Sequence, residues 1–392
     1  MKIDVESVRN ETPAVAHLTH LNNCGSSLPP TPVLNAAIDY LNDEAAMGGY
    51  EAWAQRSVAI DEVYGSTARY LNCDVGEVAF TASASDGWWR AFTSVPLASG
   101  DRILMSRSEF QANAFGLLQA RDRGVVVDVV PNTPAGEIDL EQLEKMLDGS
   151  VKLVSLTHIS MANGAVHPAA DVGALAHRAG ALFLLDSCQA AGQRPLDVEE
   201  LQCDFLCYTG RKFMRAMRGT GILYARSSAI DRLGPSPFVD GRSAEWTSPD
   251  EYRFAPGALR FEFGEQNFAG KVALGVATNY MLKLGLGAIS DRITDLSTRL
   301  RQGLQEIDGI TLRDEGVDQC GIVTFTSNQA EPASIQKGLA VQRINLGAPG
   351  KRNAQLDIGA RGLDAVVRAG VHYFNTEDEI DMAVAAIRSI TS

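Results

Sequence analysis

Short apolar runs alternate with amphipathic segments from the start of the chain to about residue 230. Seven of these runs have the length and composition of buried strands: 77–82, 101–106, 125–130, 151–158, 181–187, 204–210 and 221–226. Thr31 and Pro32 have the pattern of an N-cap and the first residue of a helix, and apolar residues recur after them at helical spacing. Strands that alternate with helices are mostly parallel and covered on both faces, so this pattern predicts an α/β domain.

The pattern changes after about residue 230. A connection rich in Pro and Gly is followed by long helical patterns over about 266–305, weaker strands at 320–326 and 366–371, and a last helix. This second pattern predicts a smaller α+β domain. The domain boundaries that we predict are an N-terminal arm and substrate loop over 1–30, a large domain over 31–255, and a small C-terminal domain over 256–392.

Composition and charge exclude several classes of protein. The 392 residues are 45% hydrophobic and 21% charged, which is typical of a globular chain with a large core. The net charge of −13 argues against nucleic acid or an anionic membrane as the main partner. No apolar segment has the length of a signal peptide core or a membrane span, so we expect a cytoplasmic protein. Six cysteines without a CxxC pair predict no disulfides, and six histidines, of which only His17 and His20 have HxxH spacing, predict no metal site.

Polar residues follow several of the predicted strands, at the edge where open α/β sheets bind ligands. These residues are Thr81, Ser83, Ser85, His158, Asp186, Gln189, Thr209 and Lys212.

Lys212 lies in the stretch "YTGRKFMRAMRGTG", which holds four cations and no acid in an otherwise acidic chain. Neighbouring cations and partial desolvation lower the pKa of a lysine amine, as an imine-forming lysine requires. A surface lysine on a basic loop is the alternative for this stretch taken alone.

Two further segments point to the same chemistry. Asp186 ends the apolar run "ALFLLDS", and a buried carboxylate needs a cationic partner, which a protonated pyridine nitrogen would supply. Opposite charges about 4 Å apart attract by roughly 4 kcal/mol at an effective dielectric near 20, although a structural salt bridge is the alternative for Asp186 alone. In "FTASASDGWW", a strand leads through small residues into a helix, whose N-terminal N–H groups and the Ser85 hydroxyl can bind a phosphate.

A phosphate cradle, a strand-end acid and a turn lysine in this order resemble the pyridoxal phosphate enzymes of the aspartate aminotransferase fold. Nearly the whole chain resembles aminotransferase class V, through the motifs "LNNCGSSLPP", "GGYEAW", "THISMANGAVHPAADVG", "LDSCQAAGQ", "TGRKFMRAMRGTGILY" and "VVRAGVHYFNTEDEID". Several motifs look closest to the branch of isopenicillin-N epimerase-like proteins and hercynylcysteine sulfoxide lyases. The resemblance implies a fold-type I transferase with a mostly parallel seven-stranded sheet, working as a homodimer with its active site near the interface.

The resemblance also implies the residues that hold pyridoxal 5′-phosphate. Lys212 forms the Schiff base and later moves the α-proton, Asp186 pairs with the pyridine nitrogen, and Gln189 contacts the phenolic oxygen. The phosphate is held by Ala84, Ser85, Thr209 and Arg211. A flat ring suits stacking, so Phe110 is expected over the face of the cofactor.

Three residues are expected to meet the substrate, which is a small amino acid. Arg368 falls where the family binds the α-carboxylate, a task that suits a planar bidentate donor. Asn23 and Trp88 are further candidates for the substrate pocket. The alternative for Trp88 is packing of its helix on the sheet.

Two departures from the family pattern bear on the reaction. Residues 344–362 correspond to the mobile loop that carries the persulfide-forming cysteine of desulfurases, but they contain no cysteine, so we reject cysteine desulfurase. Glu265 stands where many relatives have a threonine that reaches the partner's phosphate. We expect an enzyme that forms an α-carbanion from an amino acid, with β-elimination of a sulfur group favoured over transamination and epimerisation. A non-enzymatic module that binds the cofactor is disfavoured because Lys212, Asp186 and Arg368 are all present.

Overall fold

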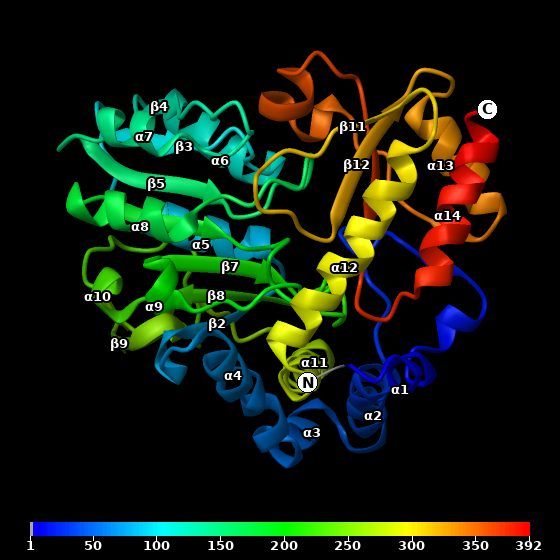
Figure 1. Ribbon diagram of the computed structural model, residues 1–392. Helices are drawn as coiled ribbons and strands as arrows, with labels where there is room; N and C mark the ends of the chain where they lie inside the picture. Colours follow the sequence, from blue (N-terminus) through cyan, green and yellow to red (C-terminus); the bar gives the residue numbers. More distant parts are fainter. Residues whose placement is uncertain (1–2) are drawn as a thin grey trace.

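A seven-stranded sheet forms the centre of the computed structural model, which describes residues 3–392 (Figure 1). Its strand order is β2-β8-β7-β6-β5-β3-β4, and only β8 runs antiparallel to its neighbours. The strands are β2 (Val78–Thr81), β3 (Arg102–Met105), β4 (Val126–Val129), β5 (Val151–Thr157), β6 (Leu182–Asp186), β7 (Phe205–Thr209) and β8 (Gly221–Ala225). Each lies within one of the seven predicted runs, so the predicted mostly parallel sheet is confirmed.

The apolar runs form strands because helices bury both faces of the sheet. In β6, Phe183 and Leu185 belong to the core on one face, while Leu182 and Leu184 belong to the core on the other. One face is covered by α5 and α6, and α8 covers β5 and β6 from the opposite face. The helices of the large domain are α2 (Thr31–Met47), α3 (Gly49–Gln55), α4 (Ser57–Leu71), α5 (Ala84–Ser94), α6 (Gln111–Asp122), α7 (Leu140–Met146), α8 (Ala169–Arg178), α9 (Val198–Leu201) and α10 (Ser227–Ile230).

The C-terminal part of the chain contains a second, smaller sheet of order β11-β12-β14, which is antiparallel throughout. Helices α12, α13 and α14 bury its apolar face in a separate core (Figure 1). The strands are β11 (Ile310–Leu312), β12 (Ile322–Ser327) and β14 (Val367–Gly370), and the helices are α11 (Phe268–Leu284), α12 (Leu286–Gln305), α13 (Pro332–Val341) and α14 (Glu377–Ile390). The predicted boundary at residue 256 stays a prediction, since α11 packs on α2 and α4 of the large domain.

The N-terminal arm connects these two parts. After α1 (Val5–Asn10), strand β1 (Thr19–His20) pairs in parallel with β13 (Ile344–Asn345) of the C-terminal part. A few residues later, the N–H of Ser27 donates to the carbonyl oxygen of Arg211 at 2.8 Å. The arm therefore links the small sheet to the turn that carries Lys212.

The structure differs from the predicted elements in three places. The long helical patterns over about 266–305 form two helices, α11 and α12, and the 80° bend between them at Gly285, where φ is +89°, was not predicted. A hairpin of β9 (Ala244–Ser248) and β10 (Glu251–Phe254) was not predicted, because its strands are short and mostly exposed and each holds only two apolar residues. Helix α2 begins at Thr31 with Pro30 as its N-cap, one residue earlier than predicted.

Within residues 3–392, no single helix is long and apolar enough to cross a membrane, and α11 with α12 meets that test only as a bent pair.

Candidate active site

A cavity lies at the C-terminal ends of the central strands, and we call it the strand-end cavity. Thr157, Asp186 and Thr209 are the last residues of β5, β6 and β7, and all three line it. Its full lining is Ser83, Ala84, Ser85, Phe110, Thr157, Met161, Asp186, Cys188, Gln189, Thr209, Arg211 and Lys212. This set contains all eight residues that were predicted to hold the cofactor.

Lys212 reaches this cavity from a tight turn after β7. Its side chain is 7% exposed, and Nζ donates to Sγ of Cys188 at 3.2 Å. Gly192, with φ of +89°, allows the turn to pack closely, because a Cβ at this position would overlap the backbone of Phe213. The position of Lys212 therefore depends on Gly192, which lies in the loop after the neighbouring strand β6.

Asp186 is a buried carboxylate without a cationic side chain to neutralise it. Oδ1 accepts a hydrogen bond from the N–H of Cys188 and Oδ2 accepts one from Nδ2 of Asn113, each at 2.9 Å. Burial raises the pKa of Asp186, although these hydrogen bonds and the charge of Lys212 oppose the shift. None of the ion pairs among residues 3–392 includes Asp186, which disfavours the alternative of a structural salt bridge.

Gln189 and Phe110 both form part of the wall of this cavity. Nε2 of Gln189 donates to the carbonyl oxygen of Cys24 at 3.1 Å, while its buried Oε1 has no hydrogen-bond partner. The ring of Phe110 faces Lys212, with 6.0 Å between the ring centroid and Nζ. An orphaned amide oxygen and an open aromatic face are features of a site that is built to hold another molecule.

The start of α5 and the turn after β7 form a positively polarised end of the cavity. Helix α5 begins at Ala84, and the hydroxyl of its N-cap Ser83 accepts a hydrogen bond from the N–H of Asp86. Burial lowers the pKa of the Arg211 guanidinium, and the nearby charges of Arg218 and Arg368 act in the same direction. Helix N–H groups and clustered guanidinium groups favour anions.

The structure brings Arg368 to the rim of this cavity. Its Nη1 donates to the carbonyl oxygen of Met161 at 3.0 Å, and Met161 lines the cavity. Nε of Arg368 is buried without a partner, so part of the guanidinium remains free to bind a carboxylate.

Asn23 and Trp88 do not line the strand-end cavity. The Asn23 amide is fully used inside the protein, since Nδ2 donates to His20 and Gly370 carbonyl oxygens and Oδ1 accepts from Ser27. Trp88 is 0% exposed and stacks on Phe92 at 4.6 Å between ring centroids. For Trp88, this is the packing role that the sequence left open.

Sequence reasoning missed three residues of the site: Cys188, Glu109 and Asn113. Cys188 lies between Asp186 and Gln189 in the chain, so it follows the same strand and could have been included with them. Glu109 lies three residues after the predicted strand 101–106, just as Asp186 lies at the end of the predicted strand 181–187. The argument that predicted a buried acid at Asp186 therefore also predicts one at Glu109. Asn113 has no such signal, because its role depends on the side chains it joins.

Comparison with known proteins gives the family. The family described as Aminotransferase class-V matches residues 19–382. A probable cysteine desulfurase of Methanothermobacter thermautotrophicus is 28% identical over 98% of both chains, and a cysteine desulfurase of Serratia proteamaculans is 28% identical over 100% of this chain and 99% of its own. The apo structure of a cysteine desulfurase from Thermococcus onnurineus is 26% identical, with a TM-score of 0.92 over 100% of this chain and 98% of that one.

These relatives correct one expectation. They are named cysteine desulfurases, whereas the motifs led us to expect the branch of epimerase-like proteins and sulfoxide lyases. The comparisons therefore give the family, and they do not give the branch that the motifs predicted.

The strand-end cavity fits pyridoxal 5′-phosphate, the cofactor of this family. Asp186 would pair with the pyridine nitrogen, Lys212 would bind the aldehyde carbon, and Phe110 would cover one face of the ring. The N-terminus of α5, Thr209 and Arg211 would hold the phosphate. The cavity supplies each charge and ring contact that the cofactor requires, and the family match spans most of the chain, so this protein belongs to the aminotransferase class V family and is a pyridoxal-phosphate-dependent enzyme.

Proposed function

We propose that the protein is a C–S lyase, which breaks the Cβ–S bond of a sulfur-bearing α-amino acid by direct β-elimination. The observation that carries this proposal is the absence of cysteine from residues 344–362, a segment that pairs through Gly347 with Arg368 at the rim of the strand-end cavity. The names of the relatives support a sulfur amino acid as substrate.

Residues 344–362 are fixed next to the cavity by several contacts. Nδ2 of Asn353 donates to Oε1 of Gln111 at 3.0 Å, next to the cavity residue Phe110. The carbonyl oxygen of Leu356 accepts a hydrogen bond from Nε of Arg107 at 3.2 Å. A thiol on this segment could reach a substrate, so its absence bears directly on how sulfur leaves.

Cys188 is the thiol that lines the strand-end cavity, and its environment disfavours a persulfide. Burial raises the pKa of this thiol, although the charge of Lys212 opposes the shift. A persulfide forms when a thiolate attacks the substrate sulfur, and a raised pKa keeps Cys188 as the unreactive thiol. Sulfur therefore leaves with a proton as a thiol or as sulfide, without first bonding to the protein.

Each residue has one task in this reaction. Pyridoxal phosphate, when bound, supplies the electron sink for negative charge at the α-carbon of the substrate. Arg368 binds the substrate carboxylate, and Nζ of Lys212 removes the α-proton and later returns it to a leaving group or product. The Cβ–S bond breaks with its electron pair on sulfur, and water converts the remaining three-carbon fragment to pyruvate and ammonium.

Product analysis with single amino acids tests the proposal. With L-cysteine or L-cystine and no keto acid, we expect continued release of pyruvate and ammonium in equal amounts. Alanine with sulfur bound to the protein would instead identify a desulfurase. Consumption of one amino acid per cofactor without further turnover would identify an aminotransferase, and loss of chirality at Cα with the Cβ–S bond intact would identify an epimerase.

Cys188→Ala is the matched control for the route of sulfur. Direct elimination predicts that the variant keeps most of its pyruvate release, because the thiol does not bond to substrate. Loss of sulfur release with normal cofactor binding would assign the persulfide to Cys188 and overturn direct elimination.

We also propose that the enzyme acts as a homodimer. Helices α2, α3 and α4 expose several large apolar side chains on one side of the chain, which is unusual for a monomer. They are Leu34, Ile38, Leu41, Met47, Tyr50, Trp53 and Val58. Light scattering should give about twice the chain mass of 42.1 kDa, and Tyr50→Glu with Val58→Glu should lower it toward one chain. A native mass of one chain would refute the dimer.

A further inference from the structure

Glu109 is a second buried carboxylate close to Asp186, and the mechanism above does not use it. The side chain is 5% exposed and lies in the segment just before α6. Its oxygens accept hydrogen bonds from the hydroxyls of Ser155 at 3.0 Å and Thr157 at 3.3 Å, both on β5. No ion pair between residues 3 and 392 includes Glu109, so the carboxylate is held by neutral donors.

Asn113 joins the two carboxylates. Its Nδ2 donates to Oε2 of Glu109 at 3.1 Å and to Oδ2 of Asp186 at 2.9 Å. Asn113 is 0% exposed, and its Oδ1 has no hydrogen-bond partner. Leaving Oδ1 without a partner costs free energy, and the two carboxylate acceptors offset this cost by binding Nδ2. The carboxylates of Glu109 and Asp186 therefore determine the orientation of the Asn113 amide. The reversed amide would place Oδ1 against two carboxylate groups.

This arrangement fixes the orientation of Asp186. The N–H of Cys188 holds Oδ1 and the Asn113 amide holds Oδ2, so the carboxylate plane cannot rotate freely. Asp186 also lines the strand-end cavity, where its remaining lone pairs are available to a bound cation.

We propose that Glu109 and Asn113 are positioning residues of the cofactor site: Glu109 orients the Asn113 amide, and this amide holds the Asp186 carboxylate in the plane that the pyridine nitrogen requires. The inference depends on the cofactor and not on the reaction, so it can be tested even if β-elimination is wrong.

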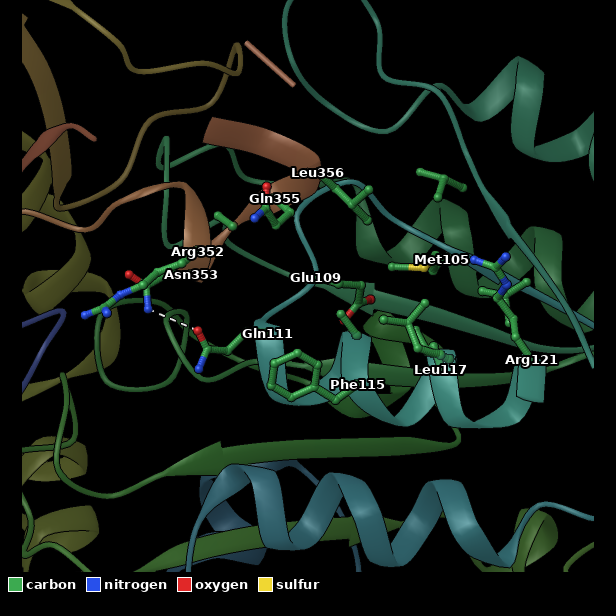
Figure 2. A pocket seen from close by; sticks show the side chains of 15 residues that line it. Met105, Glu109, Gln111, Phe115, Leu117, Arg121, Arg352, Asn353, Gln355 and Leu356 are labelled. Atoms are coloured by element: carbon green, nitrogen blue, oxygen red, sulfur yellow. Dashed lines mark hydrogen bonds between the residues drawn. The ribbon is translucent and has the colours of Figure 1, made fainter. Parts of the chain in front are cut away.

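Glu109 also lines a second cavity, which lies between α6, β4 and residues 352–356 (Figure 2). Figure 2 shows its side chain at the inner wall, away from Arg352 and the hydrogen-bonded pair Gln111 and Asn353. Glu109 therefore lines one cavity and Asp186 lines the other, and the Asn113 amide joins the two carboxylates. This position explains how a residue that does not line the strand-end cavity can act on it.

The test measures the dissociation constant of pyridoxal phosphate by absorbance, for the cofactor-free protein reloaded in solution. Losing the Asn113 hydrogen bond to the charged Asp186 costs about tenfold in affinity, so we expect a rise of this size for Asn113→Ala, and a rise of the same size or less for Glu109→Ala, which frees the Asn113 amide to turn. The double variant should be no weaker than Asn113→Ala, because Glu109 acts through Asn113. Glu109→Gln should restore near-native affinity, since Oε1 of glutamine can accept the same hydrogen bond.

Two further measurements separate positioning from folding. Thermal unfolding of each cofactor-free variant reports stability, and Asn113→Ser is a second variant if Asn113→Ala does not fold. Glu379→Gln is the matched control, because Glu379 is a buried carboxylate in α14 and lines neither cavity; its affinity should match that of the native protein. Independent, multiplying losses in the double variant, or unchanged affinity in stably folded single variants, would overturn the proposal.

Discussion

Replacing Glu109 by Gln should change how the stability of the cofactor-free protein depends on pH. Burial raises the pKa of Glu109 from its ordinary value of 4.5 to about 7, and the charge of Asp186 acts in the same direction. The other side chains that face Glu109, those of Asn113, Ser155 and Thr157, are neutral. Between pH 4.5 and 7 the unfolded chain has lost this proton while the folded protein keeps it. Stability therefore falls as the pH rises through this window.

The size of the effect follows from the two pKa values. Each pKa unit corresponds to about 1.4 kcal/mol, so ionisation of Glu109 costs the folded protein about 3 kcal/mol relative to the unfolded chain. About 2.5 kcal/mol of this cost arises between pH 5 and pH 8. Glutamine stays neutral throughout. The free energy of unfolding of Glu109→Gln should therefore rise relative to the native protein by about 2.5 kcal/mol over this range.

Urea unfolding of both proteins at pH 5 and pH 8, followed by tryptophan fluorescence, measures this difference. The comparison cancels the buried histidines, which titrate in both proteins. Glu262→Gln is a control: burial opposes ionisation of Glu262, but Lys271, the Phe80 N–H and Arg242 hold its pKa below the ordinary value. Ionised Glu262 therefore stabilises the folded protein at every pH above 4.5. The free energy of unfolding of Glu262→Gln should be lower than that of the native protein by the same amount at pH 5 and at pH 8. A Glu109→Gln difference that does not grow with pH would refute the reasoning.

The remaining predictions concern the strand-end cavity. Lys212→Ala should abolish turnover without unfolding the protein, and borohydride should then fail to fix the cofactor to the chain; near-native turnover would remove Lys212 from its role. Asp186→Ala should weaken cofactor affinity, measured by absorbance, because the pyridine nitrogen loses its counter-charge. Arg368→Lys keeps the charge but loses the planar fork, so KM for amino acids should rise while cofactor affinity stays, and an equal loss for amines without a carboxylate would count against it. Gly192→Ala should displace the Phe213 backbone and lower both cofactor affinity and thermal stability, and a variant that unfolds at the native temperature would contradict this.

The large sheet could be predicted because burial on both faces leaves a simple signal. Strands such as β6 are apolar at every position until the last, where Asp186 reaches the ligand edge. The same rule placed Thr209 and Lys212 at that edge. The hairpin of β9 and β10 had no such signal, since Trp246 and Tyr252 on it are exposed.

Roles that depend on side-chain partners could not be predicted from the sequence. Trp88 has the same spacing on α5 whether it faces a pocket or Phe92, and only the packed structure distinguishes the two. Asn113 and Asp186 are 73 residues apart, and their hydrogen bond forms because α6 follows β3 while β5 lies between β3 and β6. No pattern of neighbouring residues in the sequence predicts this hydrogen bond.

The N-terminal arm makes contact with both the C-terminal part and the turn that carries Lys212. Strand β1 pairs with β13 of the C-terminal part, and eight residues after Thr19 the N–H of Ser27 donates a hydrogen bond to the carbonyl oxygen of Arg211, next to Lys212. A rotation of the small sheet that carried β13 with it would therefore pull on the turn of Lys212. If Arg368 on β14 binds the substrate as proposed, a shift of the small sheet on binding would reach the Lys212 turn through a segment that does not line the strand-end cavity.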